Sequence, residues 1–478
     1  MVDPGSIGAT IPLARPRSIH LVGVGGSGIS AIAVILATMG HRVSGVDVNE
    51  TSAWPALAEA GVAVDVVPEV ELFDLTGRPG IEVVAHSTAF RPSPQSVASV
   101  AAAGALLTDR AGILAAICAT RPTVAVSGTH GKTSTTAMLA TLLERVGADP
   151  SYLVGATPVT LGRAARWGGP GGTFVVEADE SDGSFVALGA APAVVTNVEE
   201  DHLDHWGNID AIEDAFDRFL QQADTRVVCV DRPDGGGTAD ERVVRLAERH
   251  AAITVGEAPG ARFRIHHVDV SRLTTTFGLE VDGRELGPVS IGTPGRHHAR
   301  NAATSLAVAT TLGIEPAAAV AALAEYRGVA RRFQVVGEAA GVTVVDDYAH
   351  NPGKVGALIG SAKEAGWGRV VVVFQPHRYS RTDKQGDDLG RALSLADLVA
   401  VTEVYAAGED PIPGVSGEGL AEVARRGDAE VVWTPTLDDA VAWVLAEARA
   451  DDLVLTVGAG DVHRVAPLVL AGLADRAG

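Results

Sequence analysis

The chain contains very little cysteine: two residues, Cys118 and Cys229, in a sequence of 478. So few cysteines exclude a disulfide framework and a zinc site built from cysteine thiolates. The sequence also lacks any apolar run of the roughly 18 residues that a membrane-spanning helix needs. Its first residues lack the cationic and apolar segments of a secretion signal. We therefore expect a cytoplasmic protein.

Basic residues are outnumbered as well. The chain has 38 lysines and arginines against 59 aspartates and glutamates, which gives a formal net charge of −21 at pH 7. Such a charge disfavours nonspecific binding to nucleic acids and acidic membranes, so we expect neither as a partner. We interpret the excess of acid as a source of solubility. The length is sufficient for two to four domains, each with its own core.

Short apolar runs alternate with helical stretches along most of the chain, which predicts parallel α/β sheets. Residues 1–120 form the first predicted domain, a Rossmann-like one. Residues 121–327 form a central domain of the phosphate-loop type, which also contains a small antiparallel sheet after Ala261, with tight turns such as "VDGRE". Residues 328–478 form a second Rossmann-like domain, with a third parallel sheet.

The first glycine-rich stretch, "LVGVGGSGIS", follows a predicted strand and opens a predicted helix. Gly23, Gly25 and Gly28 match G-x-G-x-x-G, and Asp47 ends the next strand, where an acid binds a ribose hydroxyl. The pattern predicts only that a phosphate approaches the backbone at a helix N-terminus. A dinucleotide and a nucleotide diphosphate linked to a sugar satisfy it equally, and a turn without a ligand is the third interpretation.

A second glycine-rich stretch, "SGTHGKTSTT", spans residues 127–136. Gly128 and Gly131 allow backbone N–H groups to face an anion. Lys132 is placed to reach the β- and γ-phosphates of a nucleotide, and the Thr133 hydroxyl is placed to bind Mg²⁺. Val126 stands where the usual phosphate loop has a glycine, so this loop is a shortened form.

Two later strands end in acidic residues, in "VVEADESDGSF" and "NVEEDHLDHW". If both strands run parallel to the loop strand, their carboxyl ends meet at one crevice. Glu177 and His202 would then be metal ligands beside the γ-phosphate. Taken singly, an acid at a strand end is solvated in most proteins, and His202 alone is equally explained as a helix cap.

The last third of the chain carries "DDYAHNP" and "QPHRYSRT", each directly after an apolar strand. Arg378 and Arg381 provide guanidinium groups that can hold a carboxylate. His350 provides an imidazole that can orient a small polar substrate. The two motifs therefore predict a small-molecule site in this domain.

Taken together and in order, these motifs resemble the Mur ligase family. The resemblance rests on "GVGGSGIS", "GTHGKTST", "EADESDGSF", "NVEEDHLDHW", "GRHHARNA", "RRF", "DDYAHNP", "QPHRYSRT" and "GAGD", which cover nearly the whole chain. It implies three domains that bind a UDP-sugar, ATP and an amino acid. It further implies a ligase, a monomer or homodimer, that joins L-alanine to the lactyl carboxylate of UDP-N-acetylmuramate through an acyl phosphate, in peptidoglycan precursor synthesis.

The resemblance also implies roles for particular residues. The UDP-sugar would contact Gly23, Gly25, Gly26, Ser27, Gly28, Asp47 and His86. ATP would contact Gly128, Thr129, His130, Gly131, Lys132, Thr133, Ser134, His298, Asn301, Arg332 and Asp346. The catalytic residues would be Lys132, Glu177 and His202, and the ligands of Mg²⁺, or alternatively Mn²⁺, would be Thr133, Glu177 and His202. The amino acid would contact His350, Arg378 and Arg381.

Four positions depart from the family pattern. His298 and Asn351 replace an asparagine and a histidine, Gly112 replaces a glutamate, and Ala406 replaces a proline. These departures keep open a paralogue that accepts glycine or serine. An NAD-dependent oxidoreductase is the alternative from another enzyme class, because the first glycine loop suits it. A nucleotide-binding regulator without catalysis is the third alternative.

Overall fold

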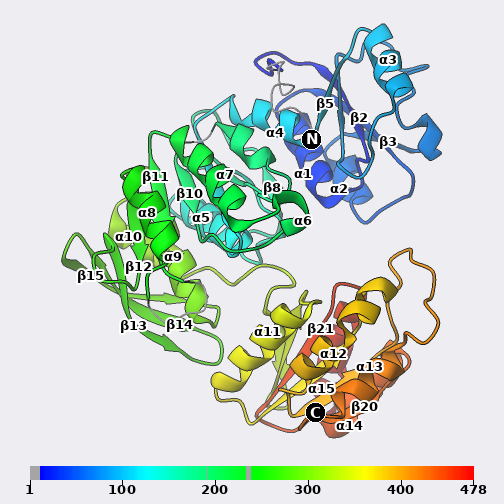
Figure 1. Cartoon of the computed structure of the whole chain (residues 1–478), viewed down its shortest axis with the longest axis vertical. Helices are drawn as coiled ribbons and strands as arrows, with labels where there is room; N and C mark the ends of the chain where they lie inside the picture. Colours follow the sequence, from blue (N-terminus) through cyan, green and yellow to red (C-terminus); the bar gives the residue numbers. More distant parts are fainter. Residues whose placement is uncertain (1–10, 190, 233–237, 478) are drawn as a thin grey trace. The chain divides into compact units, whose positions relative to one another are not determined.

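The structure is a computed structural model that describes residues 11–189, 191–232 and 238–477 (Figure 1). The chain divides into two compact units. The first comprises Met1–Val268, Thr276–Ile291 and Arg296–Arg327, and the second comprises Asp269–Thr275, Gly292–Gly295 and Gly328–Gly478. Within the described ranges, no helix combines the length and the apolar character needed to cross a membrane.

The first unit begins with a five-stranded parallel sheet of order β3-β2-β1-β4-β5, as predicted. Its strands are β1 (Ser18–Val22), β2 (Arg42–Asp47), β3 (Ala63–Val66), β4 (Val83–His86) and β5 (Leu106–Asp109), and its helices are α1 (Ser27–Thr38), α2 (Trp54–Glu59), α3 (Pro94–Ala102) and α4 (Arg110–Cys118). Strand β1 is completely buried and pairs with β2 on one side and β4 on the other. The strand order therefore reverses at β1, which is where ligands bind in open α/β sheets.

Most of a ten-stranded sheet also belongs to the first unit, and its strand order is β15-β14-β13-β12-β11-β10-β6-β9-β7-β8. The strands are β6 (Thr123–Ser127), β7 (Ser151–Leu153), β8 (Ala165–Arg166), β9 (Phe174–Glu177), β10 (Ala193–Val195), β11 (Arg226–Cys229), β12 (Ile253–Gly256), β13 (Phe263–Val270), β14 (Thr275–Val281) and β15 (Arg284–Ile291). Both β9 and β10 pair in parallel with β6. The carboxyl ends of β6, β9 and β10 therefore lie at the same edge of the sheet, as a common crevice requires.

The predicted antiparallel strands are present, and they extend the central sheet instead of forming a separate one. Strand β13 pairs in parallel with β12. Strands β14 and β15 are joined by Asp282 and Gly283 alone, with φ values of 50° and 78°. Two residues with positive φ make the tight turn of a hairpin, so β14 and β15 run antiparallel.

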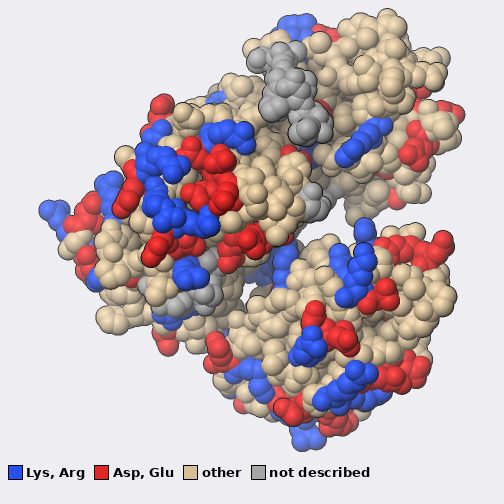
Figure 2. All heavy atoms as spheres, in the orientation of Figure 1, with Lys and Arg blue, Asp and Glu red and all other residues tan. Residues whose placement is uncertain are grey.

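The helices that accompany this sheet are α5 (Lys132–Arg145), α6 (Leu203–Trp206), α7 (Ile209–Gln221), α8 (Glu241–Arg249), α9 (Arg296–Thr311) and α10 (Pro316–Leu323). Helix α7 shows why such segments fold: Ile212, Phe216 and Phe219 recur at helical spacing and are buried. Its outer face is charged. Figure 2 shows acidic and basic side chains interspersed over α7 and α8, where Arg242 pairs with Asp210 at 2.9 Å.

The second unit is built on a six-stranded sheet of order β16-β17-β21-β18-β19-β20. Its strands are β16 (Gln334–Ala339), β17 (Val342–Asp347), β18 (Arg369–Phe374), β19 (Leu398–Val401), β20 (Glu430–Trp433) and β21 (Asp452–Val457), and its helices are α11 (Pro352–Glu364), α12 (Tyr379–Leu393), α13 (Gly417–Ala424), α14 (Leu437–Glu447) and α15 (Val465–Ala477). Alternate β18 residues pack in different clusters, Val372 with α11–α13 and Val373 with α14 and α15. Helices therefore cover both faces.

The expectation of a wholly parallel sheet is wrong at one edge of this unit. Strand β16 runs antiparallel to β17. Only Ala340 and Gly341 separate the two strands, and both have positive φ values, 52° and 74°. A two-residue turn can join only antiparallel neighbours, because a parallel pair requires a crossover of a dozen or more residues.

Candidate active site

The shortened glycine loop lies between β6 and α5 in the first unit. Gly128 and Gly131 have φ values of 130° and 85°, which favour glycine. A Cβ at Gly128 would lie 2.1 Å from Oγ1 of Thr196, and one at Gly131 would lie 2.7 Å from Oδ1 of Asn301. The loop therefore requires glycine at both positions, for its backbone and for the close approach of its neighbours.

Residues at the end of β10 hold the loop from the other side. Asn197 accepts a hydrogen bond from the backbone N–H of His130 at 2.9 Å and donates one to its carbonyl at 2.9 Å. The Thr196 hydroxyl donates to the same carbonyl at 2.5 Å. Neither residue was predicted to belong to the site, although Asn197 is the first residue of the quoted motif "NVEEDHLDHW" and Thr196 directly precedes it.

Lys132 is the first residue of α5, and its ammonium group makes three contacts. Its Nζ donates to the carbonyls of Gly128 at 2.8 Å and Thr129 at 3.2 Å, and to Oε2 of Glu180 at 2.6 Å. The Glu180 side chain is only 3% exposed. Burial raises the pKa of Glu180, and the charge of Lys132 opposes that rise. Glu180 belongs to the motif "EADESD", but it is not among the predicted site residues.

Glu177 ends β9 and pairs in register with Val126, directly before the loop. Its Oε1 accepts a hydrogen bond from the Thr133 hydroxyl at 2.9 Å, and its Oε2 accepts one from the Gly155 N–H at 2.7 Å. Burial raises the pKa of Glu177. Gly155 lies so close that a Cβ there would be 2.6 Å from Oε2. The carboxylate is therefore fixed with one oxygen beside Thr133.

The oxygens at this place suit a hard cation. Thr133 Oγ1 and Glu177 Oε1 are 2.9 Å apart, which is about the spacing of neighbouring ligands around an octahedral Mg²⁺ with bonds near 2.1 Å. A further carboxylate oxygen, Oε1 of Glu180, is buried without a hydrogen-bond partner. His202 has a left-handed backbone, with φ 51°, and its Nε2 lies 3.9 Å from that oxygen.

Among the residues described, no group of three or more His, Cys, Asp or Glu side chains is arranged to hold a metal by itself. In nucleotide sites Mg²⁺ takes one or two carboxylates from the protein and completes its shell with phosphate oxygens and water. The residues present therefore fit a magnesium ion that arrives with a nucleotide.

Helix α9 brings two further candidates to the first unit. Asn301 lies against Gly131, and its Nδ2 is buried without a hydrogen-bond partner. His298 is also buried, with an unpartnered Nδ1. Burial, together with the neighbouring His297, lowers the pKa of His298 well below its usual range. A neutral imidazole and a free amide can both bond to a nucleotide. The predicted contact of both residues with adenine stays a prediction.

The other glycine loop follows β1. Gly23 has φ 75°, and α1 begins at Ser27, whose side chain lies outside the described part. Both oxygens of Asp47 accept backbone hydrogen bonds, from Gly25 at 2.8 Å and from Val48 at 2.7 Å. Asp47 therefore holds the loop in place, a role that differs from the predicted ribose contact.

A cavity of about 720 Å³ adjoins this loop. Phe90 and Phe73 are among its lining residues. Phe90 touches the loop, because a Cβ at Gly23 would lie 2.8 Å from its ring. Phe73 packs edge-on against His86, with ring centroids 6.0 Å apart, and His86 pairs in register with Val22 directly before the loop. The loop, His86 and the cavity are therefore contiguous.

In the second unit, the predicted amino-acid residues lie in one cluster. Arg381 donates to Nδ1 of His377 at 3.1 Å, and the rings of His377 and His350 are 6.1 Å apart. Tyr405 stacks on His377 at 5.6 Å and accepts the Arg378 N–H through its carbonyl at 2.8 Å. Burial lowers the pKa of His350 to about 4. The cluster is therefore cationic through its arginines, with a neutral histidine.

A second group in this unit surrounds Tyr348. Arg331 and Arg332 place their guanidinium groups 5.0 and 5.6 Å from its ring. Arg331 also donates to the Gly458 carbonyl at 2.6 Å and lies 3.4 Å from the Asp346 carboxylate. Arg332 and Asp346 are among the predicted ATP contacts, whereas Arg331, which makes more contacts, is not. The "RRF" motif alone could not distinguish the two arginines.

Comparisons with known proteins decide the family. Three family models match consecutive parts of the chain: "Mur ligase family, catalytic domain" over residues 18–122, "Mur ligase middle domain" over 126–309, and "Mur ligase, glutamate ligase domain" over 331–460. The chain belongs to the Mur ligase family. The predicted family is confirmed, and the oxidoreductase alternative is thereby set aside.

Several Mur ligases are similar to this chain over nearly its full length. A UDP-N-acetylmuramate–L-alanine ligase of Kineococcus radiotolerans is 42% identical, over 99% of this chain and 100% of its own. One of Thermobifida fusca is 40% identical, over 95% and 96%. The solved structure of a UDP-N-acetylmuramate–alanine ligase from Thermotoga maritima has a TM-score of 0.77 at 26% identity, over 95% of this chain and 98% of its own. The predicted α/β fold class is confirmed.

One departure of this Mur ligase from its family pattern has a structural explanation. Gly112 lies in the first turn of α4, and a Cβ there would lie 2.1 Å from the Thr108 hydroxyl. Its N–H is held by the helix cap Asp109 at 2.8 Å. Thr108 therefore fills the space in which a larger residue at position 112 would begin.

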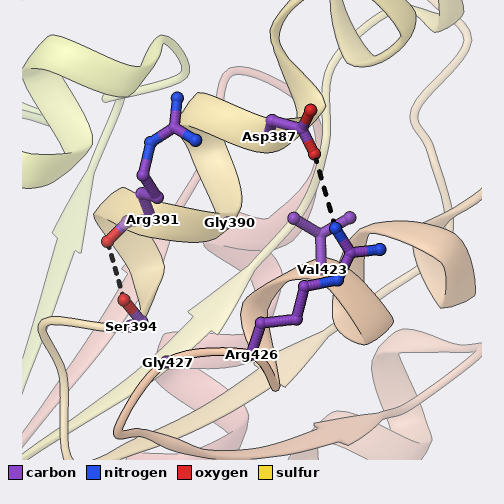
Figure 3. Close-up of a pocket in the computed structure, with 7 residues that line it drawn as sticks. All are labelled: Asp387, Gly390, Arg391, Ser394, Val423, Arg426 and Gly427. Carbon is purple, nitrogen blue, oxygen red and sulfur yellow. Dashed lines mark hydrogen bonds and ion pairs between the residues drawn. The ribbon is translucent and has the colours of Figure 1, made fainter.

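The second unit of the Mur ligase also has a hollow of about 290 Å³ between α12 and α13 (Figure 3). The helices approach closely there, because a Cβ at Gly390 would lie 2.5 Å from Val423. Figure 3 shows Arg426 directed toward Asp387, at 3.9 Å, across the hollow. None of the predicted site residues lines it, so it takes no part in the candidate active site.

Proposed function

We propose that the chain joins L-alanine to the carboxylate of UDP-N-acetylmuramate in an ATP-dependent reaction that supplies peptidoglycan precursors. The observation that carries this proposal is the similarity over the full length, at about 40% identity, to proteins named UDP-N-acetylmuramate–L-alanine ligase. The geometry of both glycine loops supports it. A paralogue that accepts glycine or serine is the competing assignment, and the choice of acceptor distinguishes them.

The shortened loop takes the triphosphate of ATP in this proposal. The first N–H groups of α5 and those of residues 128–131 surround the phosphates. Lys132 places a positive charge on the phosphoryl oxygens, where negative charge develops during transfer. Asn301 contributes its unpartnered amide from α9. The remaining loop residues, Thr129, His130 and Ser134, position this backbone.

Magnesium is part of the same proposal. Thr133, Glu177 and His202 would hold it, with Glu180 adjoining. The ion, when bound, neutralises charge on the phosphoryl oxygens. Mn²⁺, which prefers the same oxygen ligands, would serve as the alternative ion.

The reaction then proceeds in two displacements. A substrate carboxylate oxygen attacks the γ-phosphorus, the bond to the β-phosphate oxygen breaks, and ADP leaves. The amine of L-alanine attacks the resulting acyl carbon, loses a proton, and inorganic phosphate leaves as the amide forms. Lys132 stabilises the charge of the first step. Arg378 and Arg381 hold the alanine carboxylate, and the neutral His350 accepts a hydrogen bond near the amine.

The first loop holds the diphosphate of the UDP-sugar. Backbone groups of Gly23–Gly28 approach it at the N-terminus of α1. The adjoining cavity takes the uridine, and His86 packs against Phe73, one of the residues that line it. The three family matches support one domain for each substrate, with boundaries near residues 120 and 327. We further propose a cytoplasmic location and a monomeric or homodimeric state.

Mass spectrometry of the product tests the function. The protein is incubated with ATP, Mg²⁺, UDP-N-acetylmuramate and isotopically labelled L-alanine. The proposal predicts a labelled product in which one water has been lost between the two substrates. A labelled product formed without UDP-N-acetylmuramate, or no product at all with active protein, would contradict it.

A further inference from the structure

Two consecutive histidines of strand β13 are in contact through their rings. His266 and His267 both belong to β13, in which successive side chains ordinarily point to opposite faces. Here the two rings lie 4.8 Å apart at 87° to one another, and their Nδ1 atoms are 2.9 Å apart. Such a contact between consecutive strand residues needs a local change of the backbone.

That change is at His267, which has φ 49°. The left-handed region costs a residue with a side chain on the order of 1 kcal/mol or more. His266 is accommodated by a second feature, since a Cβ at Gly278 would lie 2.1 Å from its ring. The ring contact therefore depends on two features: the left-handed backbone at His267 in β13, and the absence of a side chain at Gly278 in β14.

A carboxylate fixes the protonation of the first histidine. Nε2 of His266 lies 3.0 Å from Oε2 of Glu285, on β15. The carboxylate accepts this hydrogen bond, so Nε2 carries the proton and the lone pair of neutral His266 is on Nδ1. A histidine that donates its second N–H to a carboxylate is the usual arrangement of a metal ligand.

We propose that His266 and His267 form a bidentate site for a transition-metal ion of the Cu²⁺ or Ni²⁺ type, with Glu285 orienting the first ligand. The distance between the Nδ1 atoms selects the geometry. Two metal–nitrogen bonds of about 2.0–2.1 Å at a right angle place the nitrogens about 2.9 Å apart, whereas a tetrahedral angle places them about 3.3 Å apart. Right-angled ligands suit Cu²⁺ and Ni²⁺.

Binding requires one change of tautomer. Without metal, His267 donates a proton from Nδ1 to the lone pair of His266. With metal, that proton moves to Nε2 of His267, which leaves both Nδ1 lone pairs directed at the ion and releases no proton overall. His267 is exposed, so water can complete the coordination. The site is independent of the ligase reaction.

Titration calorimetry and electron paramagnetic resonance with Cu²⁺ alone test the proposal on the full chain. The expected result is one site whose spectrum shows coupling to two imidazole nitrogens. His267→Asn should remove it, and asparagine is chosen because it tolerates the left-handed backbone. His266→Asn should do the same. Glu285→Gln should weaken binding by about 10- to 100-fold, the usual cost of losing such a partner.

The matched control is His250→Asn. Nε2 of His250 also lies against a carboxylate, Oδ1 of Asp217 at 2.9 Å, but within the described residues no second imidazole contacts its ring. This variant should keep the Cu²⁺ site. Ni²⁺ should bind more tightly than Zn²⁺, because only Zn²⁺ requires the nitrogens to separate. Unchanged Cu²⁺ binding in His267→Asn, equal loss in His250→Asn, or a preference for Zn²⁺ would overturn the proposal.

Discussion

The Nζ atom of Lys132 lies 2.6 Å from Oε2 of Glu180, and both side chains are largely buried. The two other contacts of this ammonium are loop carbonyls, those of Gly128 and Thr129. An ammonium has three hydrogens, so all of its donors are used within the protein. A phosphate can bond to Lys132 only when one of these acceptors gives way.

Replacing Glu180 should therefore change nucleotide binding through Lys132. Glu180→Gln replaces the charged acceptor of Lys132 with a neutral one that holds the ammonium less strongly, so ATP measured without Mg²⁺ should bind on the order of tenfold more tightly. The gain should vanish in a Lys132→Met background, because the effect acts through the lysine.

Asp179→Asn is the matched control for this experiment. It removes a charge from the same loop, but the Asp179 carboxylate bonds to Ser181 instead of Lys132. Calorimetry should show little change for this variant. Equal gains in Glu180→Gln and Asp179→Asn, or weaker binding in Glu180→Gln, would show that the Lys132–Glu180 contact is not what competes with ATP.

Glu177 and His202 should act as one unit in metal use. Glu177→Ala and His202→Ala should each raise the Mg²⁺ concentration needed for half-maximal turnover and depress the rate by on the order of 10²-fold. The double variant should be little worse than the worse single variant, because residues that serve one ion are not additive. Multiplicative losses in a Mg²⁺ titration of all three variants would speak against a shared ion.

The glycine loops and the parallel strands were predictable because their signals are local. Glycines at fixed spacing after an apolar run indicate positions where the backbone takes a positive φ, and Gly23, Gly128 and Gly131 all have one. Alternation of apolar runs and helical stretches likewise predicted the two parallel neighbours of β6. These features depend on residues close together in the sequence.

The contacts that could not be predicted from the sequence join residues that are far apart in the chain. Glu180 reaches Lys132 across 48 positions, and Asn197 reaches His130 across 67. Nothing in "EADESD" distinguishes Glu180, one of its two glutamates, as a buried residue. Asp47 shows the reverse case, since its type and spacing suggested a ribose contact, yet both oxygens hold backbone N–H groups. Burial and direction of a side chain are properties of the packed fold.

The first loop should recognise the UDP-sugar and not NAD(H). UDP-N-acetylmuramate at 100 times its dissociation constant should stabilise the protein by about 2.7 kcal/mol, which is visible as a rise in melting temperature. Gly25→Val should abolish the rise, because a Cβ there already lies 2.6 Å from Thr51 and 3.0 Å from the Asp47 carboxylate.

Gly28→Ala is the control for this loop. A Cβ at Gly28 would be 3.5 Å from Arg110, an ordinary contact, and its φ is not positive. The rise in melting temperature should therefore be largely retained. The proposal that this loop binds the diphosphate would be contradicted by a saturable rise in melting temperature with NADH. It would also be contradicted if the UDP-sugar still raised the melting temperature of Gly25→Val.

A buried histidine should make the first unit sensitive to acid. His20 lies within β1 with no exposed surface, and burial lowers its pKa to about 4. The unfolded chain takes up a proton near pH 6.5, whereas the folded chain resists it until about pH 4. The free energy of unfolding should therefore fall as the pH drops through this window, by roughly 3 kcal/mol at its lower end.

Nuclear magnetic resonance of labelled histidine measures this directly, with His20→Gln used to assign the signal. The His20 resonance should remain that of the neutral ring at pH 5. A titration midpoint near 6.5 in the folded protein would contradict the burial of this side chain. The stability of His20→Gln should also depend less on pH between 6.5 and 4.

The release of inorganic phosphate across a panel of amino acids tests the central claim most directly. The assay contains ATP, Mg²⁺ and UDP-N-acetylmuramate, with L-alanine, glycine, L-serine or no amino acid. The account predicts rapid release with L-alanine, at least tenfold slower release with glycine or serine, and none without the UDP-sugar. Phosphate release that does not depend on UDP-N-acetylmuramate, or that is fastest with glycine or serine, would contradict it.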